Sequence, residues 1–132
     1  MPFDWNNFLT LAHELATKMD EASKRTAISR AYYCAFNFAL ARAVANVGPR
    51  PRDVPSHQWC WNQYIRTAHP ACKQLGITGQ RMKDLRVKAD YHAEDIAKDI
   101  RRLDEKVQRM LQEAHDFLAD LTALDRTYPR RP

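Results

Sequence analysis

The chain has 132 residues, which is the size of one domain and too short for two independent hydrophobic cores. Its 21 Lys and Arg against 16 Asp and Glu give a formal charge of +5, a balance that permits an acidic partner such as nucleic acid without requiring one. No apolar run approaches membrane-spanning length, because Arg42 interrupts the best candidate at residues 35–47, and no basic leader opens the chain, so we exclude an integral membrane protein and expect a cytoplasmic one.

Amphipathic periodicity predicts two helices in the first part of the chain. Apolar residues recur at spacings of three and four over residues 4–20, and Asp4 is placed to cap the start of this helix. A second helix, rich in alanine with aromatic residues interleaved, is expected over residues 23–47. Three prolines and a glycine in residues 48–55 then end it.

The middle of the chain predicts shorter elements. Ser56 is placed to cap a third helix with the sequence "HQWCWNQYIRTA". Pro70 and the pair Gly76 and Gly79 predict an irregular connection, so that a fourth helix begins near Gln80. No stretch alternates convincingly at period two, and we therefore predict no sheet.

The last helix has the strongest pattern in the chain. Its apolar residues follow each other at alternating spacings of four and three with no Gly or Pro between them: Ile96, Ile100, Leu103, Val107, Met110, Ala114, Phe117, Leu121 and Leu124. A helix over residues 93–125 would be about 50 Å long, whereas a compact domain of this size is roughly 36 Å across. Two interpretations stay open: the stripe is the core of an elongated monomeric bundle, or a second copy of the chain covers overhanging turns at Phe117, Leu121 and Leu124.

Together these elements predict an all-α protein. We expect an up-and-down helical bundle of about five helices with a long C-terminal helix, over residues 1–125, and a basic C-terminal tail at residues 126–132. We also expect a homodimer, in which the second chain covers part of the last helix or the basic groove near Arg86.

Two segments resemble a known family. The second helix contains "SRAYY" at residues 29–33, Ser56 and His57 begin the next helix, and "RVKADYH" follows at residues 86–92. This combination resembles the small stand-alone HEPN domains (higher eukaryotes and prokaryotes nucleotide-binding), and the resemblance covers nearly the whole chain. It implies a helical bundle that commonly dimerises, is often encoded beside a minimal nucleotidyltransferase, and in many branches acts as a metal-independent ribonuclease.

The resemblance also implies a catalytic pair. In the ribonuclease branches an Arg and a His separated by four to six residues act together, usually with a polar residue after the Arg. Here the pair is Arg86 and His92, with Val87 in the place of the polar residue. Arg86 would stabilise charge on a phosphodiester, and His92 would take the proton of a ribose 2′-hydroxyl. One histidine cannot serve as both base and acid, which is a second reason to expect two chains.

Helical geometry leaves two interpretations of this segment. On an unbroken helix Arg86 and His92 point about 120° apart, and Arg86 instead faces Asp90 as an ion pair four residues away. If the helix breaks near Asp90, which is a good N-cap residue, both side chains converge on one groove. The catalytic interpretation therefore requires that break.

Further residues are expected to serve this groove. Three basic residues would guide phosphate toward it: Arg81, Lys83 and Lys88. A supporting polar cluster would consist of Arg30, His57, Asp90 and Tyr91. Within it, Arg30 is expected to reach toward Asp90 or His57, while most of the aromatic rings in residues 32–38 lie in the core.

A zinc site is the main alternative for the histidines and cysteines. His57-x-x-Cys60 and His69-x-x-Cys72 offer four ligands with helical spacing. However, Cys60 lies in an apolar helix, where a cysteine usually acts as a small buried hydrophobe. The three cysteines form no CxxC motif, which fits a reducing compartment. We predict no metal.

The remaining motif candidates predict no chemistry. Residues 76–79 lack the Lys-Ser/Thr that a phosphate-binding loop needs, so we predict no cofactor. His13 and His115 lie at helical positions with no partner in view and are expected to be ordinary surface or boundary residues.

Two function classes follow. The first is a toxin-like effector that cleaves RNA as a dimer, with Arg86 and His92 in the chemistry. The second is a non-catalytic adaptor that pairs with a nucleotidyltransferase and uses the same groove for a nucleotide or for the partner's surface. Cleavage of RNA by the purified protein would distinguish them.

Overall fold

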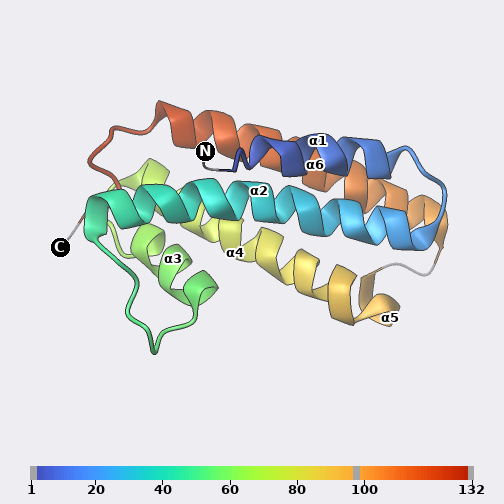
Figure 1. Ribbon diagram of the computed structural model, residues 1–132, viewed down its shortest axis with the longest axis horizontal. Helices are drawn as coiled ribbons and strands as arrows, with labels where there is room; N and C mark the ends of the chain where they lie inside the picture. Colours follow the sequence, from blue (N-terminus) through green and yellow to red (C-terminus); the bar gives the residue numbers. More distant parts are fainter. Residues whose placement is uncertain (1–2, 97–98, 131–132) are drawn as a thin grey trace.

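The computed structural model describes residues 3–96 and 99–130, and within this part the only regular secondary structure is α-helix. Its elements, in chain order, are α1 (Asn6–Ala16), α2 (Glu21–Val47), α3 (Ser56–Ile65), α4 (Pro70–Tyr91), the single turn α5 (Ala93–Ile96) and α6 (Ile100–Ala123). The predicted all-α bundle with a long C-terminal helix is confirmed (Figure 1). Among the described helices, none has the length and apolar character needed to cross a membrane.

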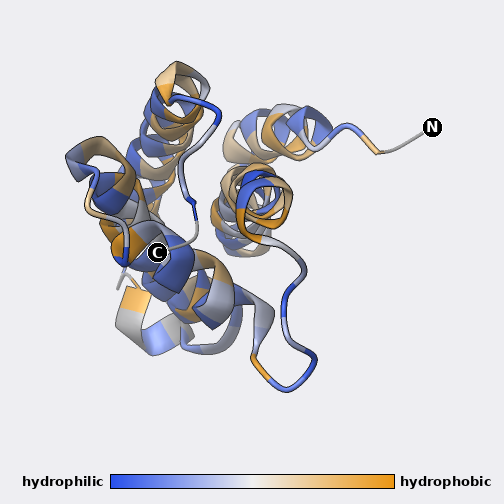
Figure 2. Cartoon of the chain, turned by 90° about the vertical axis from the view of Figure 1, so that its left-hand side faces the viewer, coloured by the Kyte–Doolittle hydropathy of each residue, from blue (hydrophilic) through white to orange (hydrophobic). Residues whose placement is uncertain are grey.

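α2 lies at the centre of the bundle and packs against α1, α3, α4 and α6. Figure 2 shows the bundle nearly end on, with the loop that follows α2 projecting from it. Alanine occupies every fourth position along α2, and all of these alanines are fully buried: Ala27, Ala31, Ala35, Ala39 and Ala43. Residues four apart share one face of a helix, so this stripe of small side chains gives neighbouring helices a surface that they can approach closely.

The ends of the first two helices have identifiable causes. α1 is shorter than the predicted 4–20, and its N-cap position is Trp5, although the Asp4 carboxylate accepts a hydrogen bond from the Asn6 backbone N–H at 3.0 Å. Asp20 caps α2 by accepting from the Ser23 N–H at 2.9 Å. α2 ends at Gly48, whose φ of 119° is a backbone conformation that favours glycine.

The prediction of an irregular connection at Gly76 and Gly79 is wrong. α4 begins at Pro70, with His69 as its cap, and continues through both glycines. Both are buried against α3: a Cβ atom on Gly76 would lie 2.7 Å from Ile65 Cγ1, and one on Gly79 would overlap the Trp61 ring. The glycines therefore let α3 and α4 approach closely. Ser56, predicted as the cap of α3, is instead its first residue, after Pro55 at the N-cap position.

The single last helix predicted over residues 93–125 is also wrong. α5 ends at Ile96, and α6 begins anew at Ile100 after Asp99, which accepts a hydrogen bond from the Arg102 N–H at 2.9 Å. The 24 residues of α6 span about 36 Å, which matches the size of the domain. No overhanging turn remains to be covered.

The apolar stripe of α6 lies in the core of the single chain. Phe117, Leu121 and Leu124 are all buried there, at 2%, 7% and 8% exposure. The monomer-core interpretation of the stripe is therefore confirmed, and the expectation that a second chain covers these three residues is wrong. The homodimer itself stays a prediction.

The segment after α6 folds back onto the bundle. Arg42 on α2 donates hydrogen bonds to the backbone carbonyls of Tyr128 and Asp125, and Pro129 is fully buried. The structure describes residues 126–130 of the basic segment predicted at residues 126–132, and the Tyr128 carbonyl in it accepts a hydrogen bond from Arg42 of α2. Residues 131–132 lie outside the described part.

Replacing Gly79 with Ala tests the packing of α3 on α4. In an ordinary helix this change stabilises by about 0.5–1 kcal/mol; here we expect it to destabilise by roughly 1–3 kcal/mol, because the new methyl group meets the Trp61 ring. Denaturant unfolding measures the difference. Gln80→Ala, on the exposed face of the same helix, is the matched control and should change stability by less than about 0.5 kcal/mol. A stabilised Gly79→Ala variant would contradict the packing argument.

Candidate functional site

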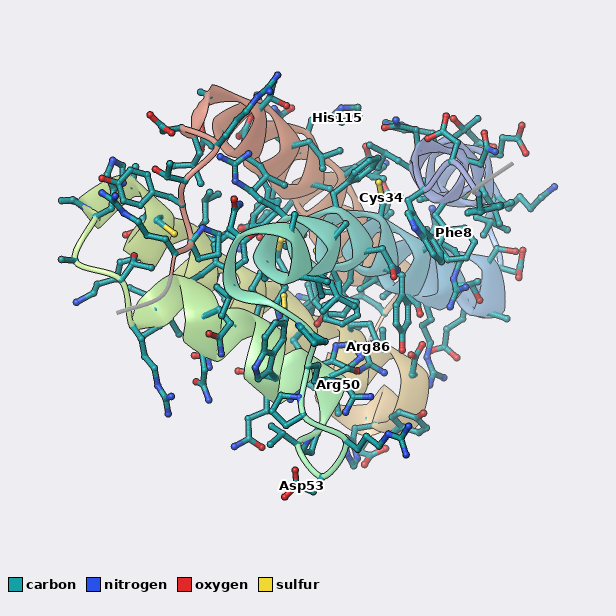
Figure 3. The ribbon with its side chains drawn as sticks, turned by 60° about the vertical axis from the view of Figure 1, so that its left-hand side comes forward. Phe8, Cys34, Arg50, Asp53, Arg86 and His115 are labelled. Carbon is teal, nitrogen blue, oxygen red and sulfur yellow. The ribbon has the colours of Figure 1, made fainter. Side chains whose placement is uncertain are left out.

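The two segments that carry the family resemblance meet in space. The Arg86 guanidinium carbon, on α4, lies 5.5 Å and 5.2 Å from the ring centroids of Tyr32 and Tyr33 on α2. Figure 3 shows the labelled Arg86 on the side of α2 that faces α4. We call the whole group the arginine–aromatic cluster, and its members are Ser29, Arg30, Tyr32, Tyr33, Phe36, His57, Arg86 and Asp90.

Arg86 occupies a position of α4 that helical spacing assigns to the core. The buried residues of this face follow each other at spacings of four and three: Leu75, Gly79, Met82, Arg86 and Ala89. Only 7% of Arg86 is exposed, and a buried charge is costly unless it is paired and hydrogen-bonded. Arg86 Nη1 donates to Asp90 Oδ2 at 3.4 Å, but the buried Nε has no hydrogen-bond partner in the described part of the chain.

Arg30 is held between aromatic rings in a similar way. Its guanidinium carbon lies 4.8 Å from the centroid of Phe8 and 5.1 Å from that of Tyr33. Nη2 donates to the Ser29 hydroxyl at 3.2 Å, and this hydroxyl donates to Asp90 at 3.2 Å. Arg30 therefore reaches Asp90 only through Ser29. Its buried Nε, like that of Arg86, has no partner among the described residues.

His57 completes the cluster as a neutral ring. It stacks on Phe36 with centroids 4.0 Å apart, and its Nδ1 lies 2.6 Å from the Tyr32 hydroxyl oxygen. Burial raises the pKa of Tyr32, so its hydroxyl keeps its proton. Trp61 Nε1–H can only donate, and it donates to the Tyr32 oxygen at 3.0 Å. Among the described partners of this hydroxyl, His57 Nδ1 is therefore the one that accepts its proton. Burial, and then the charges of Arg86 and Lys83, lower the pKa of His57 to about 4. The ring proton thus lies on Nε2.

A groove of about 430 Å³ opens beside the cluster. It is lined by Trp5, Phe8, Arg30, Tyr33, Phe36, Asn37, Ser56 and His57. Arg86 connects to this groove through Tyr33, whose ring both arginines contact. Two larger hollows, of about 680 and 710 Å³, are lined by no member of the cluster. Unlike these two, the groove is lined by a residue, Arg30, whose buried Nε–H has no partner among the described residues.

The predicted phosphate-guiding residues do not gather at one place. Arg81 turns toward α6, where its Nη2 lies 3.0 Å from Glu113 Oε1. Lys83 is near enough to His57 to lower the pKa of that ring. Lys88 is exposed. Tyr91, assigned to the polar cluster by the sequence, is 71% exposed and makes no ring contact within the described residues.

Of the two interpretations left open for this segment, the structure shows the helix continuing past Asp90, so that the break lies at His92 instead. α4 continues through Asp90 to Tyr91, and His92 is the C-cap, with its backbone N–H donating to the Lys88 carbonyl at 2.9 Å. The Arg86–Asp90 ion pair expected for an unbroken helix is confirmed. The His92 side chain is exposed and makes no hydrogen bond or ion pair to Arg86. Their catalytic pairing stays a prediction.

The four residues of the alternative zinc motif have other roles. Cys60 and Cys72 are fully buried, and burial raises the pKa of both thiols, whereas zinc binds the thiolate. His57 accepts from Tyr32, and His69 Nδ1 accepts from the Cys72 backbone N–H at 3.3 Å. In residues 3–96 and 99–130 no group of three or more His, Cys, Asp or Glu is placed to hold a metal ion.

Three contacts escaped the sequence analysis. Ser29 links Arg30 to Asp90. Phe36 stacks on His57; the one signal for this contact in the sequence is that Phe36 lies four residues after Tyr32 and so shares its face of α2. His13 and His115 are exposed, as predicted for surface residues, but each is the partner of the other, which the sequence did not indicate. A contact 102 residues apart leaves no periodic signal.

Comparison with family models, with curated proteins and with solved structures finds no match for this chain. The assignment of the site therefore rests on its own geometry.

The neutral state of His57 predicts a pH dependence of stability. The pKa of its ring is about 4 in the folded protein and about 6.5 in the unfolded chain, so between these values the unfolded state binds more protons. We expect the free energy of unfolding to fall as the pH is lowered from 6.5 to 4, by roughly 1–2 kcal/mol after allowance for solvent screening at this partly exposed ring.

Denaturant unfolding at several pH values measures this loss. His57→Gln keeps an acceptor for the Tyr32 hydroxyl but does not titrate, so its stability should depend less on pH across the same window. Parallel curves for the wild type and the variant would rule out His57 as the cause.

Proposed function

We propose that this chain is a HEPN-like helical protein whose arginine–aromatic cluster binds a nucleotide unit, either free or within single-stranded RNA. One observation carries the proposal: a single carboxylate, that of Asp90, serves Arg86 directly and Arg30 only through Ser29, and each arginine has a buried Nε–H without an acceptor among the described residues. A phosphate oxygen would supply both the missing charge and the missing acceptor.

The charge balance of the cluster supports an anionic ligand. The cluster contains two guanidinium groups, a neutral His57 and one carboxylate, that of Asp90, which pairs directly with Arg86 and reaches Arg30 through Ser29. Leaving a buried donor unsatisfied costs about 1–3 kcal/mol, and well-packed apolar residues often replace buried ion pairs without loss of stability. A bound anion therefore explains two arginines with buried, unsatisfied Nε–H groups better than a contribution to stability does.

The aromatic residues support a base beside the phosphate. Tyr33 and His57, both partly exposed, line the same groove as Arg30, and Phe36 supports the His57 ring by stacking on it at 4.0 Å between centroids. Stacking of a base on an aromatic side chain contributes about 1–3 kcal/mol and tolerates any base, because every base has a π face. The groove, at about 430 Å³, falls in the range of small-molecule sites, about 300–1,000 Å³. His57 Nε2–H adds a donor that is not charged.

Replacing each arginine with Met tests this proposal. Arg30→Met and Arg86→Met remove the donors and keep similar volume, so the bundle should stay folded. Loss of a charge-assisted hydrogen bond costs about 1.5–3 kcal/mol, and we therefore expect roughly 10- to 150-fold weaker binding. Fluorescence anisotropy with a labelled single-stranded oligoribonucleotide measures it, and competition by AMP tells a free nucleotide site from one that needs RNA.

Arg66→Met is the matched control, because Arg66 is exposed at the end of α3 and outside the cluster. It removes the same charge and should leave affinity within about threefold of the wild type. Equal affinity in the wild type and in both cluster variants would refute the proposal.

Catalysis by Arg86 and His92 is the second candidate. It is favoured by the position of His92, which is exposed at the end of the helix that carries Arg86. Because His92 makes no hydrogen bond or ion pair to Arg86 in the described chain, and one histidine cannot serve as both base and acid, this function requires a dimer in which two copies of the segment meet. A protein that binds but does not cleave would instead fit the adaptor role beside a nucleotidyltransferase.

An RNA cleavage assay decides between these roles. A catalytic dimer should cleave single-stranded RNA in the presence of a chelator and leave a 2′,3′-cyclic phosphate, because the 2′-hydroxyl attacks. Arg86→Ala and His92→Ala should each lower the rate by about 10²–10⁴-fold, while Arg66→Ala should not. Light scattering must show that the variants keep the mass of a dimer. No cleavage by the wild type, or equal rates in all variants, would leave only the binding role.

A further inference from the structure

His13 on α1 and His115 on α6 meet at the surface of the bundle, away from the proposed nucleotide site. Their Nε2 atoms are 2.7 Å apart, and their ring centroids are 5.0 Å apart. Both residues are exposed, and Figure 3 shows the labelled His115 on the side of α6 that faces α1. Two imidazole nitrogens from different helices thus point at the same small volume.

We propose that His13 and His115 form a two-ligand site for a divalent transition-metal ion. Only one proton fits between the two nitrogens, so in the structure one ring donates and the other accepts. When a metal ion binds, the donor ring changes tautomer and carries its proton on Nδ1 instead of Nε2, so that both Nε2 atoms offer a lone pair and both rings stay neutral. Water fills the remaining coordination positions, since no third His, Cys, Asp or Glu joins the pair in the described part of the chain.

The spacing of the nitrogens suits this use. Two imidazole ligands at metal–nitrogen distances of about 2.0–2.1 Å have their nitrogens about 3.3 Å apart in tetrahedral geometry and about 2.9 Å apart at a right angle. From 2.7 Å, the pair must open by about 0.2–0.6 Å, which small rotations of two exposed side chains provide. No helix has to move.

The ligand atoms select the class of metal. Imidazole suits Zn²⁺, Ni²⁺ and Cu²⁺, while Mg²⁺ and Ca²⁺ prefer oxygen. Because the two ligands come from α1 and α6, a bound ion connects the first helix of the bundle to the last. A metal ion that binds only the folded protein raises the free energy of unfolding. Once the metal concentration exceeds the dissociation constant, this gain grows with the logarithm of their ratio.

Calorimetric titration of Ni²⁺ into protein without a polyhistidine tag tests the site. The wild type should bind one equivalent, and Mg²⁺ should not bind. His13→Ala and His115→Ala should each weaken Ni²⁺ binding at least tenfold, and Ni²⁺ should raise the melting temperature of the wild type but not of these variants. Circular dichroism checks that the variants keep their helices.

His92→Ala is the matched control, because His92 is exposed and its side chain makes no hydrogen bond to the described residues. It should bind Ni²⁺ as the wild type does. The two-ligand site is overturned if the wild type binds no more tightly than the double variant His13→Ala/His115→Ala, if only one of the two single variants loses affinity, or if His92→Ala loses as much as they do. These outcomes are independent of nucleotide binding.

Discussion

Close packing around α2 is the constraint on which the rest of this bundle depends. A helix that must contact four others cannot present one apolar stripe; it must be buried on most of its surface. The fully buried alanines at every fourth position meet this requirement with little side-chain volume and with the highest intrinsic helix propensity. Lys24, although charged, is buried at the start of α2 because its Nζ donates to the Ala16 carbonyl and pairs with Asp104 on α6. One long helix thereby holds α1 and α6 together.

The same helix carries the aromatic residues that receive the two arginines. Tyr32 and Tyr33 follow the serine and arginine of "SRAYY", so one short segment supplies a hydroxyl, a guanidinium group and two rings. Arg86 arrives from α4 at a position where an apolar side chain would continue the core pattern. The rings partly compensate the buried charge through cation–π contact, but they offer no acceptor to the Nε–H groups. A buried donor without an acceptor is rare in folded proteins and calls for a specific explanation, such as a bound ion or water.

Packing and chemistry are joined at Trp61. Its ring fills the space left by the missing side chain of Gly79, and its Nε1–H donates to the Tyr32 hydroxyl. That hydroxyl in turn sets the tautomer of His57. A change in how α3 packs on α4 therefore alters the protonation and orientation of a ring that lines the groove. The close approach of two helices, made possible by two glycines, is in this way part of the candidate site.

The sequence by itself determined the helical character of the chain, because helical periodicity records which residues face inward. The family resemblance indicated the two segments of the candidate site, and periodicity offered the core stripe of the last helix as one of two interpretations. It also offered the Arg86–Asp90 pair as one of two interpretations, because this pair needs only a spacing of four on one unbroken helix. Only the tertiary structure decided that Gly76 and Gly79 lie inside α4, since a glycine reads as a helix breaker until the Trp61 ring against it is known. It alone decided where α6 begins, how Ser29 links Arg30 to Asp90, and that His13 meets His115. Such contacts depend on how helices far apart in the chain are placed against each other, and local spacing carries no record of that placement.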